Sequence, residues 1–148
     1  MDVSYILDDL NDAQREAVTS ESKKLLVLAG AGSGKTKVLV HRIAWLIKAL
    51  SNSTHSILSV TFTNKAANEM TGRIESILDQ PIPEMWCGTF HSISNRLLRR
   101  HYKEAGLEKD FNILDSDDQL RIIKRNLKDL DIDEDQWPPE KVRWQINN

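Results

Sequence analysis

A glycine-rich segment near the start of the chain constrains its fold more than any other feature. Residues 30–34 contain three glycines, too many for a stable strand or helix, and they follow the apolar residues 25–29. A short, continuous apolar run is typical of a strand that is buried on both faces. After the glycines, apolar residues recur at helical spacing at Leu39, Ile43, Leu46, Ile47 and Leu50. The sequence therefore predicts a strand, a glycine loop and a helix, in that order.

The same order recurs twice further along the chain. Residues 57–62 form a second apolar segment, and Asn64 begins a helical pattern that ends before Pro81. Residues 85–88 predict a third, weaker strand, and a helix follows from His91 to near Gly106. Strands that alternate with helices are typical of a parallel α/β sheet, which is the fold class we predict.

Beyond Gly106 the pattern becomes helical and densely charged. Asn11 with Gln14, near the start of the chain, and Ser116 with Gln119 have the spacing of capping boxes, so each pair predicts the start of a helix. Pro138 and Pro139 fit the first turn of a last helix, which runs from Glu140 to Asn148 without a closing glycine. We therefore expect the 148 residues to be part of a longer chain.

Composition and charge are those of an ordinary folded protein. Of the 148 residues, 40% are hydrophobic and 28% are charged, which excludes a disordered chain, and no apolar run approaches the ~20 residues of a membrane span. The single cysteine, Cys87, excludes an internal disulfide, and the histidines lack zinc-ligand spacing. We expect a cytoplasmic protein with no membrane contact. Because the net charge is −2, any argument for nucleic-acid binding must be local.

The glycine segment and its neighbours have the chemistry of a phosphate-binding loop. The segment reads Ala29, Gly30, Ala31, Gly32, Ser33, Gly34, Lys35 and Thr36. Glycines allow several backbone N–H groups to point at one phosphate, and the following helix adds its positive end. In such a loop Lys35 would reach the β- and γ-phosphates and the Thr36 hydroxyl would bind Mg²⁺. The strict pattern has glycine where this chain has Ala29, and the alternative is a glycine turn without a ligand.

A phosphate loop that hydrolyses nucleotide also needs an acidic site for magnesium. Residues 5–9 end in two aspartates, but they precede the glycine loop and have a helix-like pattern. Capping or solvation explains them better. Residues 113–115 are too short for a strand, and Asp115 is more simply interpreted as a helix-start residue.

Four blocks together resemble a known family. Residues 10–15, 29–36, 60–67 and 88–92 match superfamily 1 DNA helicases of the UvrD/Rep/PcrA type in order and spacing, and the resemblance covers the entire chain as an N-terminal segment. It implies a partial RecA-like P-loop NTPase core, motor domain 1A, in residues 1–90. Residues 91–148 would then begin an all-helical inserted subdomain, 1B.

The resemblance also implies an activity. It implies an ATP-dependent DNA helicase that moves 3′ to 5′ on single-stranded DNA in DNA repair or replication, with ATP and Mg²⁺ as cofactors and a duplex junction as a further partner. The acidic magnesium motif and the second motor domain would lie beyond residue 148, so we expect the isolated chain to be inactive, marginally stable and exposed along an unpaired sheet edge. The alternatives are a short, non-catalytic nucleotide- or DNA-binding remnant and a P-loop ATPase of another kind.

The nucleotide contacts that the resemblance implies lie in three parts of the chain. They are Gln14, Ala29, Gly30, Ala31, Gly32, Ser33, Gly34, Lys35, Thr36, Lys37 and Arg73. Gln14 would read the adenine edge, since its amide is both a donor and an acceptor. It could equally act only as a capping partner, and Arg73 could be an ordinary solvated helix residue. Lys37 stands where many relatives have arginine, and it lacks a planar guanidinium.

The implied DNA contacts follow the second and third strands. They are Thr61, Phe62, Thr63, Asn64, Lys65, Thr89, Phe90 and His91. Phe62 would stack on a base, or would instead be a core aromatic at a strand end, and Thr63 could simply cap a helix. Two basic stripes are further candidates for phosphate contacts, with a solvated helix face as the alternative. The stripes consist of Arg96, Arg99, Arg100 and Lys103, and of Arg121, Lys124, Arg125 and Lys128.

Overall fold

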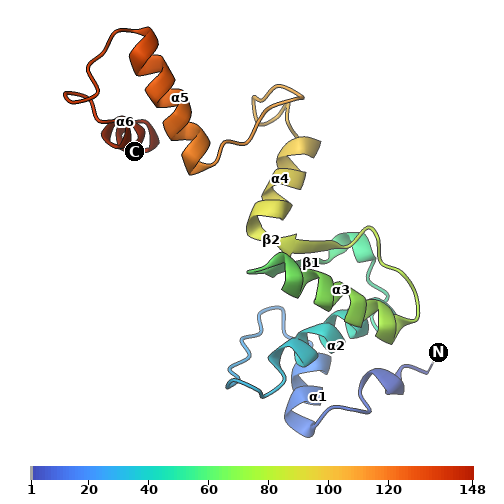
Figure 1. Cartoon of the computed structure of the whole chain (residues 1–148). Coiled ribbons are helices and arrows are strands. Elements are labelled where there is room, and N and C mark those ends of the chain that lie inside the picture. The colour runs from blue at the N-terminus through green and yellow to red at the C-terminus, as the bar shows by residue number, and fades with distance from the viewer. Residues whose placement is uncertain (1) are drawn as a thin grey trace. The chain divides into compact units, whose positions relative to one another are not determined.

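The computed structural model describes residues 2–148, which form an α/β protein with two compact units (Figure 1). The first unit ends at His101, and the second runs from Tyr102 to Asn148. The elements of the first unit are η1 (Ser4–Ile6), α1 (Asp12–Thr19), α2 (Lys35–Lys48), η2 (Thr54–Ser56), β1 (Leu58–Thr61), α3 (Asn64–Leu78), β2 (Trp86–Thr89) and α4 (Phe90–Arg100). The second unit contains α5 (Ser116–Asp129) and α6 (Pro139–Asn147).

The sheet consists of two parallel strands. β1 and β2 pair from Leu58 with Trp86 to Thr61 with Thr89, and α3 connects them. Parallel strands need such a crossover because the end of the first strand and the start of the second lie at opposite edges of the sheet. The predicted parallel pairing, with strands after residues 57 and 85, is confirmed. In the described part of the chain each strand has one neighbour only, so each leaves its outer edge unpaired.

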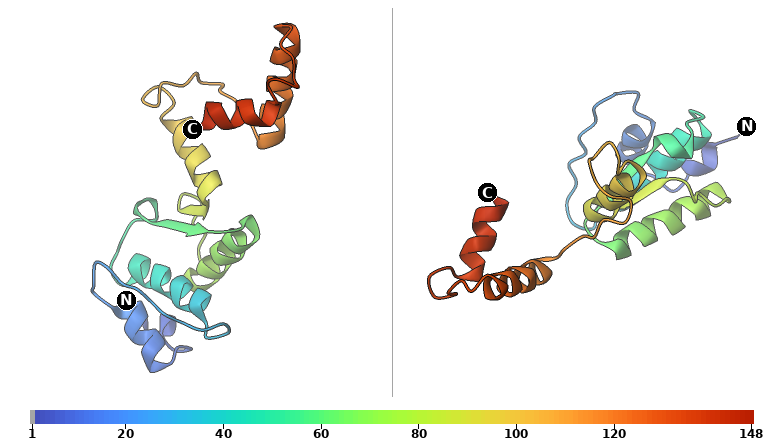
Figure 2. Two further views of the ribbon diagram at one scale, coloured as in Figure 1. Left: turned by 90° about the vertical axis from the view of Figure 1, so that its left-hand side faces the viewer. Right: turned by 90° about the horizontal axis from the view of Figure 1, so that it is seen from above.

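The main core is formed by residues of η1, α2 and α3, and Figure 2 shows α2 and α3 on one side of the strand pair. Its buried members are Ile6, Val40, Ile43, Ala44, Met70, Ile74, Leu78, Ile82 and Met85. The predicted helix after the glycine loop is confirmed, but its buried face differs from the expected stripe. Leu39 and Leu50 are exposed, whereas Val40 and His41 are buried, because α2 packs against both α1 and α3.

A smaller core joins α1 to α2. Leu10, Val18 and Val38 are buried together there, and the N-cap of α1 is Asn11. The Asn11 side chain accepts a hydrogen bond from the Gln14 backbone N–H, and the Gln14 side chain accepts one from the Asn11 N–H. The predicted capping box is therefore confirmed.

The expected strand at residues 25–29 is wrong for this structure. These residues belong to no strand, and Leu26 and Leu28 are 80% and 86% exposed. A strand that is buried on both faces needs hydrogen-bonded neighbours on either side, and β1 and β2 pair only with each other in residues 2–148. The apolar run therefore lies unpaired at the surface.

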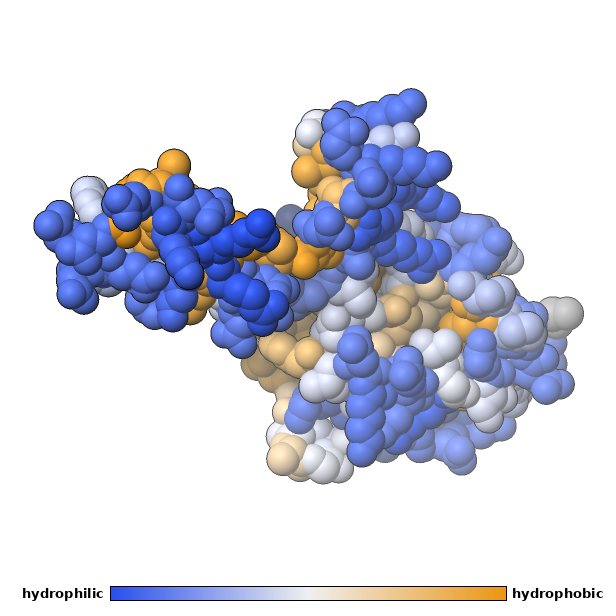
Figure 3. All heavy atoms as spheres, turned by 45° about the horizontal axis from the view of Figure 1, so that its top comes forward, coloured by the Kyte–Doolittle hydropathy of each residue, from blue (hydrophilic) through white to orange (hydrophobic). Residues whose placement is uncertain are grey.

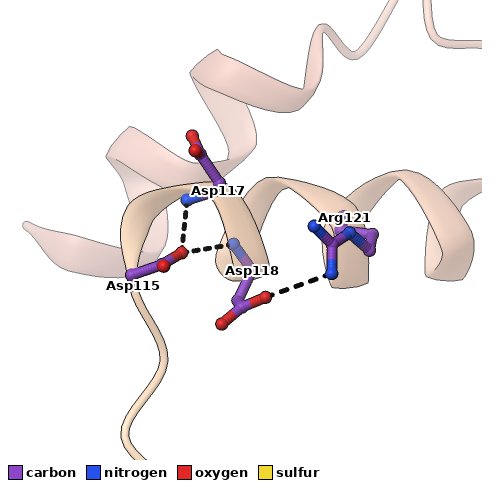
Figure 4. Close-up of polar contacts among 4 residues, drawn as sticks. All are labelled: Asp115, Asp117, Asp118 and Arg121. Carbon is purple, nitrogen blue, oxygen red and sulfur yellow. Dashed lines mark hydrogen bonds and ion pairs between the residues drawn. The ribbon is translucent and has the colours of Figure 1, made fainter.

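The second unit is a pair of helices, α5 and α6, that pack against each other. Asp115, and not Ser116, is the N-cap of α5, because its carboxylate accepts hydrogen bonds from the N–H groups of Asp117 and Asp118 (Figure 4). The helix predicted to start here is confirmed, but its cap is Asp115, which the sequence already indicated as a helix-start residue, and not Ser116. An aspartate is the stronger competitor here, since its charge also complements the positive end of the helix.

The surface of the chain combines hydrophilic residues with exposed hydrophobic ones. Figure 3 shows hydrophobic residues exposed among the hydrophilic ones on the face that it presents. The exposed apolar side chains include those of Leu26, Leu28, Phe62, Leu130 and Ile146. No helix within residues 2–148 has the length and apolar character that crossing a membrane requires.

Candidate functional site

The glycine loop leads into α2 through backbone conformations that favour glycine. Gly32 and Gly34 have φ angles of 76° and 86°, in the left-handed region that side chains with a Cβ disfavour. Gly34 is the N-cap of α2 and offers no side-chain hydrogen bond, whereas α1, α3, α4 and α5 are each capped by a side chain. The first N–H groups of a helix have no partner inside it. At α2 they are left open to an external acceptor.

Lys35, the first residue of α2, folds back onto the loop. Its Nζ donates hydrogen bonds to the carbonyls of Ala29, at 3.1 Å, and Gly30, at 2.7 Å. The Ser33 hydroxyl donates to the same Gly30 carbonyl at 2.8 Å. A positive charge is therefore held within the loop by backbone oxygens alone, which compete weakly with an anion for an ammonium group.

Gln14 connects α1 to the loop. Besides its part in the capping box, its Nε2 donates a hydrogen bond to the Ser33 carbonyl at 3.1 Å. The approach is close, since a Cβ added to Gly34 would lie 2.9 Å from that nitrogen. The capping role that the sequence left open is thus confirmed, and the same side chain also contacts the glycine loop. The adenine contact stays a prediction.

The other predicted nucleotide contacts lie around the start of α2. A cavity of about 310 Å³ is lined by residues of α1, the glycine loop and the start of α2. Gln14, Ser33 and Lys35 are among them. Thr36 is exposed in the first turn of α2. Lys37 donates a hydrogen bond to the Asp9 carbonyl at 2.6 Å, and with Arg73 of α3 it lines a second cleft of about 290 Å³.

The predicted DNA contacts gather at one edge of the sheet. Thr61 and Thr89 are paired in the register, so the segments that follow them start side by side. Asn64 and Lys65 are exposed in the first turn of α3, and His91 is exposed in the first turn of α4.

The two helices that start at this edge are capped by threonines. The Thr63 hydroxyl accepts a hydrogen bond from the Ala66 N–H at 3.1 Å, and that of Thr89 accepts one from the Ser92 N–H at 3.2 Å. The capping alternative for Thr63 is therefore confirmed. The core alternative for Phe62 is wrong, since its side chain is 97% exposed, and Phe90 is 66% exposed.

Arginines of both basic stripes contact other side chains. The guanidinium of Arg96 lies 4.3 Å from the centroid of the Trp86 ring, and that of Arg100 lies 5.6 Å from it. On α5, Arg121 and Arg125 form ion pairs with Asp118 and Asp129, at 3.2 Å and 3.7 Å. The aspartates lie at helical spacing and were detectable in the sequence. The ring was not, because Trp86 precedes a strand-to-helix bend.

Carboxylates do not gather near the loop. In residues 2–148, no three or more His, Cys, Asp or Glu side chains come close enough to hold a metal ion. The segment at residues 5–9 begins within η1, and its backbone carbonyls accept hydrogen bonds from the side chains of α1 and α2. Asp115 is a helix cap, as its position suggested.

A glycine loop before an uncapped helix, together with a parallel β-α-β unit, makes residues 2–148 an α/β protein with the loop and helix of a phosphate-loop domain, but without the strand that precedes the loop in that pattern. The model of one family, the UvrD/REP helicase N-terminal domain, matches residues 10–148. The chain belongs to this family, and the resemblance that the four sequence blocks carried is confirmed.

Individual relatives agree with the family. The chain is 58% identical to DNA helicase II of Escherichia coli and 57% identical to DNA helicase II of Salmonella typhimurium, over 148 residues in each case. It is 45% identical over 145 residues to the ATP-dependent DNA helicase PcrA of Bacillus subtilis. It spans 21% of the length of each DNA helicase II and 20% of that PcrA.

Proposed function

We propose that this chain is the nucleotide-binding and first DNA-contacting part of an ATP-dependent DNA helicase. Support comes from its relatives, which are named DNA helicases and extend well beyond the region they share with it. In this proposal the 148 residues bind ATP and contact single-stranded DNA. Hydrolysis and unwinding belong to the longer protein.

The uncapped start of α2 is the observation that carries the nucleotide proposal. Four other α-helices in residues 2–148 have a side chain that accepts from their first N–H groups, whereas α2 and α6 have none, and of these two only α2 follows a glycine loop. Helix N-termini that are left open behind a glycine loop suit phosphate, because the free N–H groups and the helix dipole both favour a negative charge.

The residues around this helix start fit Mg²⁺-bound ATP. Lys35 would exchange its two carbonyl acceptors for β- and γ-phosphate oxygens, and the Thr36 hydroxyl would hold the metal ion. Gln14 would offer its remaining amide hydrogen to the adenine edge, while Lys37 and Arg73 would extend the positive charge around the phosphates. ATP supplies the phosphoanhydride bond whose hydrolysis drives movement.

The paired strand ends support contact with single-stranded DNA. Two exposed rings, Phe62 and Phe90, follow the register partners Thr61 and Thr89, and stacking of bases on aromatic rings tolerates any sequence. Hydroxyl, amide and ammonium groups nearby would bind phosphate and sugar, which carry no sequence information. A protein that moves along DNA requires that tolerance.

The finer parts of the proposal follow the family resemblance. Residues 1–90 would belong to a RecA-like motor domain and residues 91–148 to an inserted helical subdomain near the duplex junction. The longer protein would move 3′ to 5′ in DNA repair or replication in the cytoplasm.

Nucleotide binding by this chain tests the proposal. Affinity for ATP and ADP, each with Mg²⁺, would be measured by titration calorimetry for the unchanged chain, Lys35→Ala and Lys48→Ala. Lys48 is a matched control because it has the same charge, lies at the other end of α2 and donates to Gln80. We expect Lys35→Ala to weaken ATP about tenfold or more and ADP less, since the ammonium reaches the terminal phosphates.

Equal ATP affinities for the unchanged chain and Lys35→Ala would contradict the site. A P-loop ATPase that acts on something other than DNA would bind ATP here in the same way. Measuring ATP hydrolysis by the longer protein with and without DNA distinguishes the two, because only a DNA motor would hydrolyse ATP faster when DNA is bound.

A further inference from the structure

The strand β2 continues into α4 without a connecting loop. Thr89 is the last residue of β2, and Phe90 is the first residue of α4. Phe90 and His91, both predicted to contact DNA, are therefore in the first turn of a helix whose direction is set at this junction. Any rotation of α4 relative to β2 moves their side chains.

The hydrophobic core holds α4 weakly. Ile93 is its one buried residue, and Leu97 and Leu98 are 44% and 38% exposed. By comparison, α3 buries four residues, and three of them, Met70, Ile74 and Leu78, lie in the main core. The direction of α4 must therefore depend on other contacts.

The first turn of α4 is held close to β2 by a glycine. A Cβ added to Gly88 would lie 2.5 Å from the Ser92 hydroxyl oxygen and 3.3 Å from Cγ1 of Ile93. Thr89 caps the same turn through the Ser92 N–H. These contacts hold the first turn of α4 against the end of β2. They lie next to the junction, so they constrain the angle between β2 and α4 only weakly.

Further from the bend, the stack of arginines on Trp86 ties the two elements together. Trp86 is the first residue of β2, and Arg96 and Arg100 lie one turn apart on α4. The Arg96 guanidinium is 4.3 Å from the ring centroid, well within the ~6 Å of a cation–π contact, and Arg100 is 5.6 Å from it. These contacts therefore connect the start of β2 with the C-terminal half of α4, away from the junction between the two elements.

We propose that Trp86 and Arg96 are a positioning pair that sets the angle of α4 and so holds Phe90 and His91 at the DNA-contacting edge. The inference rests on the proposed function. In this proposal Arg96 acts by stacking on the Trp86 ring and not by binding a DNA phosphate. Arg100, which is further from the ring, makes a smaller contribution of the same kind.

Variants that keep the positive charge at position 96 or an aromatic ring at position 86 distinguish a positioning role of Arg96 from a direct contact with phosphate. Affinity for an oligothymidylate would be measured for the 148-residue chain at several salt concentrations. We expect Arg96→Lys and Trp86→Leu each to weaken binding about three- to fivefold, because lysine lacks the planar group that stacks and leucine lacks the ring. Trp86→Phe keeps a ring and should restore most of the affinity. The double variant should be no weaker than either single one.

The salt dependence provides a second readout. A lost phosphate contact lowers the slope of log K against log salt by about 0.7 on a single strand, whereas a lost positioning contact leaves the slope unchanged. Unchanged affinity for Arg96→Lys, together with a lower slope for Arg96→Ala, would overturn the proposal. Lys48→Ala controls for the loss of one positive charge elsewhere in the first unit.

A DNA-free measurement keeps the inference separate from the proposed function. In NMR spectra of the free chain, Arg96→Lys and Trp86→Leu should shift the same backbone amides, those of Phe90 and His91. If the unchanged chain fails to bind DNA, the proposed function fails, and these shifts still decide whether the pair sets the junction. If the amide signals of Phe90 and His91 do not shift in Arg96→Lys, the inference is wrong. Arg96→Lys alone is sufficient for this test if Trp86→Leu does not fold.

Discussion

Thr61 and Thr89 are partners in the parallel register of β1 and β2, although 28 positions of the sequence separate them. Parallel strands place their carboxyl ends at one edge, so the two segments predicted to contact DNA begin next to each other. Each threonine is followed directly by an exposed phenylalanine, at positions 62 and 90. The sheet thus presents two aromatic rings and two helix starts on one side.

Phe62 should contribute to DNA affinity and hardly at all to stability. Its side chain is 97% exposed, so Phe62→Ala removes almost no buried surface. We expect the free energy of unfolding to change by less than ~0.5 kcal/mol, and affinity for single-stranded DNA to fall by ~1–3 kcal/mol, the range for one stacked base. Phe62→Tyr keeps the ring and serves as the control. A destabilised Phe62→Ala with unchanged DNA affinity would contradict the assignment.

Three glycines of the loop should differ in their tolerance of alanine. Gly30→Ala meets no atom within 4 Å and has no left-handed φ, so stability should change little. Gly32→Ala should cost about 1 kcal/mol from its φ of 76°. Gly34→Ala should cost more, because it combines a φ of 86° with an approach of 2.9 Å to the Gln14 amide nitrogen. Urea unfolding of the three variants measures this order, and an equal loss at all three positions would show that the loop does not adopt these conformations.

Asp115 should stabilise α5 through its two backbone hydrogen bonds. Asp115→Ala leaves the N–H groups of Asp117 and Asp118 without that acceptor, so we expect a loss of about 1 kcal/mol of helix stability. Asp115→Asn keeps an acceptor and should lose less. Ser116→Ala is the matched control, because the capping-box pattern in the sequence placed the cap at Ser116. Circular dichroism during thermal unfolding measures both, and a larger effect at Ser116 would reverse the assignment of the cap.

The exposed apolar run should make the isolated chain prone to association. Leu26→Ser and Leu28→Ser act on side chains that are 80% and 86% exposed, so we expect monomer stability to stay the same while concentration-dependent association falls. Ile74→Ala, at a fully buried position, should instead cost ~2–5 kcal/mol. Light scattering and thermal melts distinguish the two effects.

The unchanged chain itself should melt at or below the usual mesophile range of ~45–65 °C, because it is marginally stable with its sheet edges unpaired. A melt well above that range would contradict the marginal stability that we expect.

Local sequence signals determined most of the elements. The capping box at Asn11 and Gln14, the helix after residue 34 and the strand–helix–strand order from residue 57 to residue 89 all agree with the structure. Caps, periodicity and turn residues act over a few positions, so the chain itself contains the necessary information. The family likeness was also present in four short blocks, and the match over residues 10–148 confirms it.

Tertiary structure decided everything that depends on partners distant in the sequence. The apolar run at residues 25–29 has the composition of a buried strand and lies exposed, because a strand requires hydrogen-bonded neighbours that its own sequence cannot supply. Likewise, Gln14 reaches Ser33, and Arg96 stacks on Trp86, through packing that no spacing rule describes. Periodicity fixes which face of an element is apolar, but the face that meets a partner is fixed only when the elements come together.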